Sequence, residues 1–406
     1  MKILFITDRN LTHDIRVFNE LMFASSLGHK TELIAFYDQW CEQIEKVHLE
    51  LAKPRHSYYL KLSNAYYSKA VSQLTKLLYP LMKKNLWVNA FSLDYRTALI
   101  WMKLKNLPKD YDLIVAHGFN SLYPAYFFAQ KNKTQFAFDA ASFVPELENT
   151  DYDIVKLHKN KLLFKNIIPF ASYYSYATEL IGIKLKKVLD GKDADIENFS
   201  LANSYPENFF TFRPSVSDKI EFVWIGQKID LCPDLEMIIP TLYRFKDKVR
   251  LHIFGETTER FKNTYSHMGE FLVIHEPMPV DLLLKTIASY DIGLATYLTY
   301  VSPEKNYTLS NKIYAFAQNG LYTLASDTTS QRIFFSENPD FGKIVLPNID
   351  NLTEAIFSVL ANINKIREEK EKRFRLAKLF SWKYESQKLI KAWSKIENQK
   401  NESSAN

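Results

Sequence analysis

A repeated alternation of short apolar segments with amphipathic segments is the feature of this sequence that most constrains its fold. Residues 2–6 read Lys-Ile-Leu-Phe-Ile, which predicts a buried strand, and residues 15–27 then carry apolar side chains at helical spacing. Gly28 stands where a helix commonly ends, and residues 31–36 predict the next strand. This order of strand, helix and strand is typical of a parallel sheet covered by helices.

The same alternation continues and then begins again after a loop that contains Pro206 and Pro214. Apolar runs that predict strands stand at residues 113–116, 135–138 and 172–176, and then at 221–225, 250–254, 271–274, 292–295 and 321–325. We therefore predict an α/β protein with two Rossmann-like domains, each a doubly wound parallel sheet. Domains of this kind face each other and bind a ligand in the cleft between them.

The loops and the local composition also predict the domain boundaries. The first domain is expected over residues 1–205, interrupted by a basic helical insert at 53–109, and the second over 216–380. Residues 381–395 predict a helix, and the polar residues 396–406 predict a disordered tail.

Composition and missing motifs exclude several classes of protein. The chain has 406 residues, of which 47% are apolar, which excludes a disordered chain. Its 10 glycines form no G-x-G-x-x-G and no G-x-x-x-x-G-K-[ST] pattern, which excludes the standard dinucleotide fingerprint and the P-loop. Its 9 histidines form no H-E-x-x-H pattern and no paired ligand spacing, so we expect neither a catalytic nor a structural zinc.

The two cysteines, Cys41 and Cys232, lie far apart in the sequence. The first apolar run is interrupted by Asp8 and Arg9, too early for a secretory signal, and no apolar stretch is long enough to span a bilayer. We expect reduced thiols and a cytoplasmic protein, peripheral to the membrane if it contacts one.

Basic residues are concentrated in one segment. Residues 53–109 hold eleven lysines and arginines and one acidic residue, and they are interleaved with tyrosines and tryptophans. This mixture suits contact with an anionic membrane surface, where aromatic rings lie at headgroup level and each base adds about 1 kcal/mol. An ordinary solvated helical face explains the same pattern equally well. No nucleic-acid recognition motif accompanies the charge, so we expect no nucleic-acid partner.

One helix start carries an unusual cation. Within residues 306–320, Ser310 or Asn311 predicts a helix N-cap, and Gly320 predicts the end of the helix. Lys312 lies in the first turn, where the helix dipole disfavours a cation. A bound anion such as a diphosphate in front of the helix would explain the lysine. The alternative is a plain capped helix with a surface lysine, and spacing alone does not decide between them.

The same segment resembles a known family. The matching residues are Asn311, Lys312, Ile313, Tyr314, Phe316, Ala317 and Gly320, followed by Ala325, Ser326 and Asp327. They resemble the segment NKLFEYMAAG…VASD of GT-B glycosyltransferases of the large retaining family 4, which use sugar nucleotides. Weaker matches follow the same order along nearly the whole chain, at Asp14 to Val17, Gly28-His29, Tyr111 to His117, Asn203 with Pro206, Ile253 to Gly255, Tyr290 to Leu294, and Ser381-Trp382.

The resemblance implies that the C-terminal domain grips the diphosphate of a nucleotide sugar, with no essential metal or other cofactor. It also implies that the last helix crosses back to the first domain. The residues expected on the donor side are Gly226, Gln227, Lys228, Gly255, Glu256, Met278, Ser310, Asn311 and Lys312. Gly226 would let the backbone approach the diphosphate, Glu256 would meet a sugar hydroxyl, and Met278 would flank the base or simply pack.

The first domain supplies the candidates for the acceptor side. His117 ends a predicted parallel strand and is either catalytic or a histidine satisfied by the backbone. Asp14 and Arg16 form either a local ion pair at a helix start or a contact to the acceptor. Arg9 lies in the first loop, and Asp139 is as consistent with a turn or cap as with a site.

Some family positions differ in this chain. Tyr307 and Ala315 stand where the family commonly has two glutamates, and Gln227 stands in place of an arginine, for which Lys228 can substitute. We expect a glycosyltransferase acting on a lipid-linked or cell-surface polysaccharide acceptor. The alternatives are an inactive GT-B subunit that supports an active partner and, third, a sugar-nucleotide epimerase.

Overall fold

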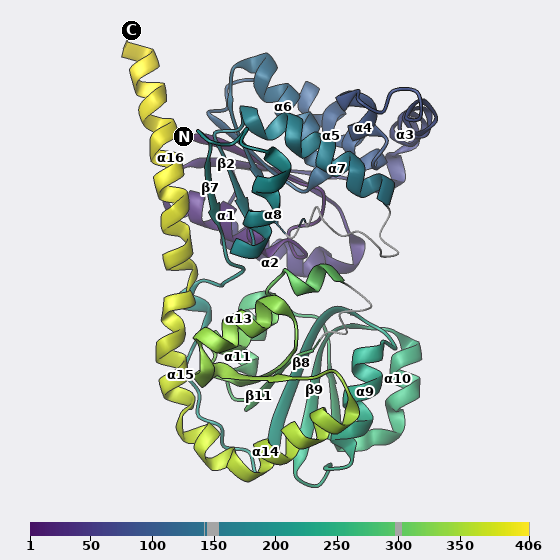
Figure 1. Cartoon of the computed structure of the whole chain (residues 1–406), viewed down its shortest axis with the longest axis vertical. Coiled ribbons are helices and arrows are strands. Elements are labelled where there is room, and N and C mark those ends of the chain that lie inside the picture. The colour runs from purple at the N-terminus through teal and green to yellow at the C-terminus, as the bar shows by residue number, and fades with distance from the viewer. Residues whose placement is uncertain (142, 144–153, 297–302, 406) are drawn as a thin grey trace. The chain divides into compact units, whose positions relative to one another are not determined.

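A computed structural model describes residues 1–141, 143, 154–296 and 303–405 (Figure 1). The chain forms two compact units, one made of Met1–Ala202 together with the chain from Ser386 onward, and the other of Asn203–Glu385. Among the helices in these ranges, none has an apolar stretch long enough to cross a bilayer.

The N-terminal unit is built on a sheet of seven strands in the order β3-β2-β1-β4-β5-β6-β7, and all paired strands are parallel. The strands are β1 Lys2–Thr7, β2 Lys30–Phe36, β3 His56–Leu60, β4 Leu113–His117, β5 Gln135–Asp139, β6 Tyr173–Tyr176 and β7 Glu197–Ser200. The helices are α1 Ile15–Ser26, α2 Glu42–Ala52, α3 Tyr66–Leu78, α4 Leu86–Phe91, α5 Tyr95–Lys105, α6 Phe119–Asn132, α7 Ile154–Ile167 and α8 Glu179–Leu189. The strand order reverses between β1 and β4, which is where ligands bind in open α/β sheets.

The C-terminal unit repeats this plan with six parallel strands in the order β10-β9-β8-β11-β12-β13. The strands are β8 Ile220–Ile229, β9 Val249–Thr257, β10 Leu272–His275, β11 Ile292–Ala295, β12 Tyr322–Ser326 and β13 Gly342–Val345. The helices are α9 Pro233–Tyr243, α10 Glu259–Tyr265, α11 Val280–Ile287, α12 Asn311–Gln318, α13 Thr329–Glu337, α14 Ile349–Glu368 and α15 Lys370–Leu376. Its order reverses between β8 and β11.

The predicted fold class is confirmed, because every predicted strand exists and both sheets are parallel. The structure adds three strands that sequence periodicity missed, β3, β7 and β13. These are edge or near-edge strands of four or five residues, too short and too polar to show a clear pattern. The segment at 53–109, which was predicted to be a helical insert, is in part a strand of the sheet. It contains β3, which pairs with β2, and its helices form the connection to β4.

The predicted disordered tail at 396–406 is corrected for its described residues, 396–405. The last helix, α16 Trp382–Ala405, drawn in yellow in Figure 1, includes them. Lys400 pairs with Asp112 at 2.6 Å, and Ile396 is buried. The residues are polar in sequence, but contacts with the N-terminal unit hold them in the helix.

Trp393 is the main apolar anchor of α16. Its side chain is 1% exposed, its indole Nε1 donates to Tyr173 Oη at 3.0 Å, and its ring packs near Phe23 and His29. Burying such a large ring ties the C-terminal end of the chain to the N-terminal unit.

We expect Trp393→Ala to lower the free energy of unfolding by about 3–5 kcal/mol, because it leaves a cavity and an unpaired tyrosine hydroxyl. Urea unfolding followed by circular dichroism measures this change. Lys391→Ala is the matched control on the same helix, since its side chain is 73% exposed, and it should change stability by less than about 0.5 kcal/mol. Equal effects of the two variants would contradict the anchoring role.

Candidate functional site

The donor-side candidates lie at the carboxyl end of β8, at the switch point of the C-terminal sheet. Trp224, near that end, is buried, and the Lys312 ammonium lies 3.8 Å from the centre of its indole ring. The Trp224 indole N–H has no hydrogen-bond partner among the described residues. The sequence analysis missed Trp224, although a tryptophan two residues before a strand-end glycine was a visible signal.

The structure gives Gly226 and Gly255 a role in packing. A Cβ on Gly226 would lie 2.4 Å from the Trp224 ring, so the absence of a side chain there makes room for the indole. Gly255 has φ +144°, and a Cβ on it would lie 2.1 Å from the Gly226 carbonyl oxygen. The glycines thus allow β8 and β9 to approach closely and let the Trp224 ring fold over the strand. A backbone approach to a diphosphate at Gly226 stays a prediction.

The start of α12 matches the predicted capped helix. Ser310 is the N-cap and its hydroxyl accepts from the Lys312 backbone N–H at 3.2 Å, while the helix ends before Gly320, which has φ +70°. Asn311 is exposed in the first turn. The helix therefore presents its first backbone N–H groups at the same edge as Trp224.

Lys312 is in an unusual electrostatic environment. Burial lowers the pKa of its ammonium to about 7, and repulsion from Lys305 acts in the same direction. Asp234 and Cys232, at the start of α9, act in the opposite direction but do not compensate. A cation that is desolvated against an aromatic ring in the first turn of a helix is the kind of group that a bound anion stabilises.

The remaining donor-side candidates spread along the same sheet edge. Gln227 and Lys228 are exposed beside the irregularity in β8, and Lys228 stands opposite Glu256 of β9. Met278 is half-buried before α11, and its sulfur accepts a long contact of 3.9 Å from the Thr286 hydroxyl. The structure therefore brings Ser310, Lys312 and Trp224 together. The other four candidates, Gln227, Lys228, Glu256 and Met278, lie on neighbouring strand ends and loops.

The N-terminal unit holds a buried polar network at the carboxyl ends of β4 and β5. Arg16 donates through Nε to Asp139 Oδ2 at 2.7 Å and also donates to the Leu201 carbonyl oxygen. His117 Nδ1 lies 3.3 Å from the same Asp139 oxygen, and its Nε2 lies 3.8 Å from Glu20. Arg16, Asp139 and His117 are thus engaged inside the unit, and Glu20 is a fourth member that the sequence analysis missed.

The titration of this network follows from burial and mutual attraction. The pKa of Glu20 rises to about 7 because burial disfavours its charge. Burial alone would lower the pKa of His117, but Glu20 and Asp139 together raise it to about 9. The stability contributed by the His117 charge is therefore complete below its ordinary pKa of 6.5 and is lost as the pH rises through about 9. The pKa of Asp139 is lowered by Arg16 and His117, against the effect of burial.

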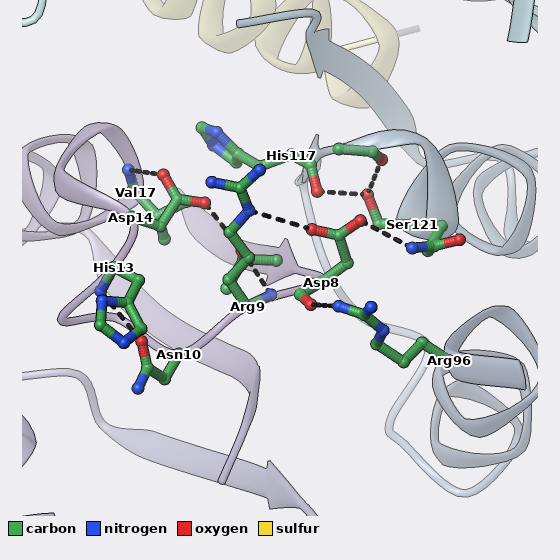
Figure 2. A network of polar contacts seen from close by, with 12 residues as sticks. Asp8, Arg9, Asn10, His13, Asp14, Val17, Arg96, His117 and Ser121 are labelled. Atoms are coloured by element: carbon green, nitrogen blue, oxygen red, sulfur yellow. Dashed lines mark hydrogen bonds and ion pairs between the residues drawn. The ribbon is translucent and has the colours of Figure 1, made fainter. Parts of the chain in front are cut away.

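Asp8 is the polar side chain at the end of β1, and the sequence analysis did not select it. Its carboxylate accepts from Asn120 Nδ2 at 2.9 Å and packs on Gly118, where a Cβ would lie 2.8 Å away. Figure 2 shows Asp8 between Arg9, whose Nε lies 4.0 Å from the carboxylate, and Arg96, which donates to the Asp8 carbonyl. Burial raises the pKa of Asp8, against the effect of both arginines.

Of two other acceptor-side candidates, one is exposed and the other caps a helix. The side chain of Arg9 is 65% exposed, so it is available to a ligand at the end of β1. Asp14 is the N-cap of α1, and its carboxylate accepts from the Val17 N–H, as Figure 2 shows. It also accepts from the Thr7 hydroxyl at 2.7 Å. Asp14 thus caps its helix, and Arg16 pairs with Asp139.

Comparisons with known proteins connect this architecture to sugar-nucleotide enzymes. No family model matches the chain, and no curated protein matches it. Among solved structures, HepE of Anabaena in complex with UDP-glucose superposes with a TM-score of 0.69 at 14% identity, covering 97% of this chain and 100% of that chain. Sucrose-phosphate synthase of Thermosynechococcus elongatus gives 0.63 at 10% identity over 98% and 100% of the two chains.

A second group of similar structures consists of epimerases. The UDP-GlcNAc 2-epimerase of Neisseria meningitidis, bound to UDP-GlcNAc, gives a TM-score of 0.59 at 12% identity, covering 97% of this chain and 100% of that chain. Both groups are consistent with the two parallel sheets, and the predicted GT-B fold is confirmed. Membership of the retaining family 4 stays a prediction.

We expect Asp139→Asn to lower the free energy of unfolding by about 3–5 kcal/mol, because it leaves the buried Arg16 guanidinium without its counter-charge. Urea unfolding at pH 7 measures the loss. Asp110→Asn removes an exposed partner of Lys2 and should cost less than about 1 kcal/mol. A loss of the same small size in Asp139→Asn would show that the pair is not a structural element of the unit.

Proposed function

We propose that this protein is a glycosyltransferase that moves a sugar from a nucleotide-diphosphate donor, with UDP as the nucleotide, to a lipid-linked or cell-surface polysaccharide acceptor. The observation that carries the proposal is the Lys312 ammonium, desolvated against Trp224 in the first turn of α12. Support for UDP comes from the similar structures, HepE with UDP-glucose and the Neisseria epimerase with UDP-GlcNAc.

The electrostatics of the C-terminal unit favour a diphosphate as the ligand. Asp234 and Cys232 do not restore the pKa of Lys312, so the bare protein pays a cost to keep this ammonium charged. A diphosphate in front of α12 would accept hydrogen bonds from the helix N–H groups and pair with the ammonium. The same two groups would stabilise the negative charge that develops on the leaving nucleotide diphosphate. We therefore propose that donor cleavage needs no essential metal.

On the acceptor side we propose Asp8 and Arg9 as the contact residues. Asp8 is held in place by Asn120 and Gly118 at the end of β1, and Arg9 beside it is largely exposed. A carboxylate and a guanidinium at one strand end suit the binding of an acceptor hydroxyl or phosphate. His117, Asp139 and Arg16 lie inside the unit, and we assign them to positioning the strand ends and not to catalysis. Retention at the anomeric carbon stays an implication of the family resemblance.

The surface of α3 favours a membrane-bound acceptor. This helix buries the small polar side chains Ser68, Ser72 and Thr75 and exposes large apolar ones. The exposed residues of α3 and the loop after it are Tyr66, Tyr67, Leu74, Leu77, Leu81 and Met82, alongside Lys69, Lys76, Lys83 and Lys84. An exposed apolar face bordered by lysines is typical of a helix that lies on an anionic membrane surface.

An epimerase is the second candidate, because UDP-GlcNAc 2-epimerases are among the similar structures. The two reactions are distinguished by the acceptor: an epimerase interconverts free UDP-sugars, whereas a transferase releases UDP only when an acceptor is added. Incubation of the protein with UDP-sugars, with and without lipid-linked acceptors, separates them by product analysis. A protein that binds no nucleotide and forms no product would be the inactive supporting subunit.

We expect UDP-glucose binding to weaken by up to roughly tenfold from pH 6 to pH 8, because Lys312 loses its proton through about pH 7 while the diphosphate keeps its charge. Isothermal titration calorimetry measures the dissociation constant across this range. Lys312→Arg should remove the slope, since arginine stays charged, and Lys312→Ala should weaken binding at pH 6 by about tenfold or more.

Lys365→Ala is the control for this series, because Lys365 is a surface lysine of α14 with a 71% exposed side chain. It should retain both the affinity and the pH slope. Unchanged affinity in Lys312→Ala would contradict the assigned diphosphate site.

We expect the protein to co-sediment with vesicles that contain anionic phospholipid, and salt should weaken this binding. The double variant Leu77→Glu/Leu81→Glu should bind about tenfold or more weakly, because it places charge on the apolar face of α3 and its loop. Leu379→Glu is the matched control, on an exposed leucine of the C-terminal unit. Vesicle binding that does not depend on anionic lipid would contradict the membrane proposal. So would a loss of binding in Leu379→Glu as large as that in the double variant.

A further inference from the structure

Three side chains able to ligate a metal meet at the carboxyl edge of the N-terminal sheet. They are His13, Asp38 and Cys41, and their ligand atoms lie within 4.8 Å of one another. His13 Nε2 lies 3.4 Å from Cys41 Sγ and 4.0 Å from Asp38 Oδ2. Cys41 is buried, whereas the side chains of His13 and Asp38 are 30% and 41% exposed.

One of these distances already matches what a tetrahedral ion requires, and another is close to it. With a metal–sulfur bond of about 2.3 Å and metal–nitrogen and metal–oxygen bonds of about 2.0–2.2 Å, neighbouring ligand atoms are separated by roughly 3.3–3.6 Å. The sulfur–nitrogen pair already has this separation. The Asp38 carboxylate lies 4.0 Å from His13 Nε2, slightly beyond this separation, and rotation of its partly exposed side chain can bring it closer.

The backbone around the cluster is held in place without a metal. Glu45 of α2 accepts from the backbone N–H groups of Leu11 and Thr12, each at 2.7 Å. Asn10 Oδ1 accepts from the His13 backbone N–H at 2.9 Å, as Figure 2 shows. The loop after β1 thus presents the imidazole from a fixed position to the short segment after β2 that carries Asp38 and Cys41.

We propose that His13, Asp38 and Cys41 form a binding site for a zinc-class divalent cation. One thiolate, one imidazole and one carboxylate are a ligand set suited to Zn²⁺, and solvent would supply a fourth ligand on the exposed side. Binding forms a metal–sulfur bond and releases the Cys41 thiol proton to solvent. The ion ties the loop after β1 to the segment after β2, and the same loop carries Asp8 and Arg9. Its role is to fix this loop, separate from the donor chemistry of the C-terminal unit.

Cobalt substitution tests the site. Untagged protein, freed of metal by a chelator and without nucleotide, is titrated with Co²⁺ under reducing conditions. We expect one Co²⁺ per chain, a thiolate-to-cobalt charge-transfer band in the near ultraviolet, displacement by Zn²⁺, and a rise in melting temperature with added Zn²⁺.

The variants decide which residues bind. Cys41→Ser should abolish the charge-transfer band, and Asp38→Asn and His13→Ala should each weaken Co²⁺ binding at least tenfold. Cys232→Ser is the control thiol, because Cys232 belongs to the C-terminal unit, and it should retain the band and the stoichiometry. No band in the wild-type protein, or a band that survives Cys41→Ser, would overturn the proposal.

Discussion

The parallel pairing of every described strand is the constraint on which the candidate sites depend. In a parallel sheet all carboxyl ends lie at one edge, so loops far apart in sequence become neighbours there. Thr7 of β1 stands opposite His117 of β4, which brings the first loop beside the loop that contains Gly118. In the C-terminal unit the same arrangement brings the end of β8 to the edge where α12 begins. Both sets lie where the strand order reverses.

The desolvated cations of the two units have different surroundings. In the N-terminal unit Asp139 and Glu20 lie close enough to pair with Arg16 and His117, although the Glu20 oxygens and His117 Nε2 have no hydrogen-bond partner among the described residues. In the C-terminal unit the carboxylate near Lys312 does not offset the desolvation of its ammonium. A desolvated ammonium at a helix start is a suitable partner for an anionic ligand. This contrast is the physical reason for proposing a nucleotide-diphosphate site in the C-terminal unit.

Much of the fold was predictable, and the sites were predictable only in part. Apolar runs located ten strands, and the capped helix at Ser310 was found because N-cap and C-cap residues act locally. The helix after residue 395 was not predictable, because Lys400 pairs with Asp112, more than two hundred positions away, and the burial of Ile396 depends on tertiary packing. For Arg16 the sequence left a local ion pair and an acceptor contact open, and its pairing with Asp139, 123 positions away, gave no local signal. The proximity of His13, Asp38 and Cys41 was not predictable from sequence spacing, since the fold and not a motif brings these three side chains together.

The sequence by itself determined the α/β class, the two rounds of strand and helix, and the capped start of α12 with its lysine. These are local properties, set by side-chain periodicity and by the hydrogen bonds of helix ends. The tertiary structure alone decided that Lys312 lies on Trp224, that Gly226 makes room for that ring, and that Asp139 neutralises Arg16. The reason is that desolvation and ion pairing depend on which surfaces the sheet brings together, and residues distant in sequence carry no local signal of that contact.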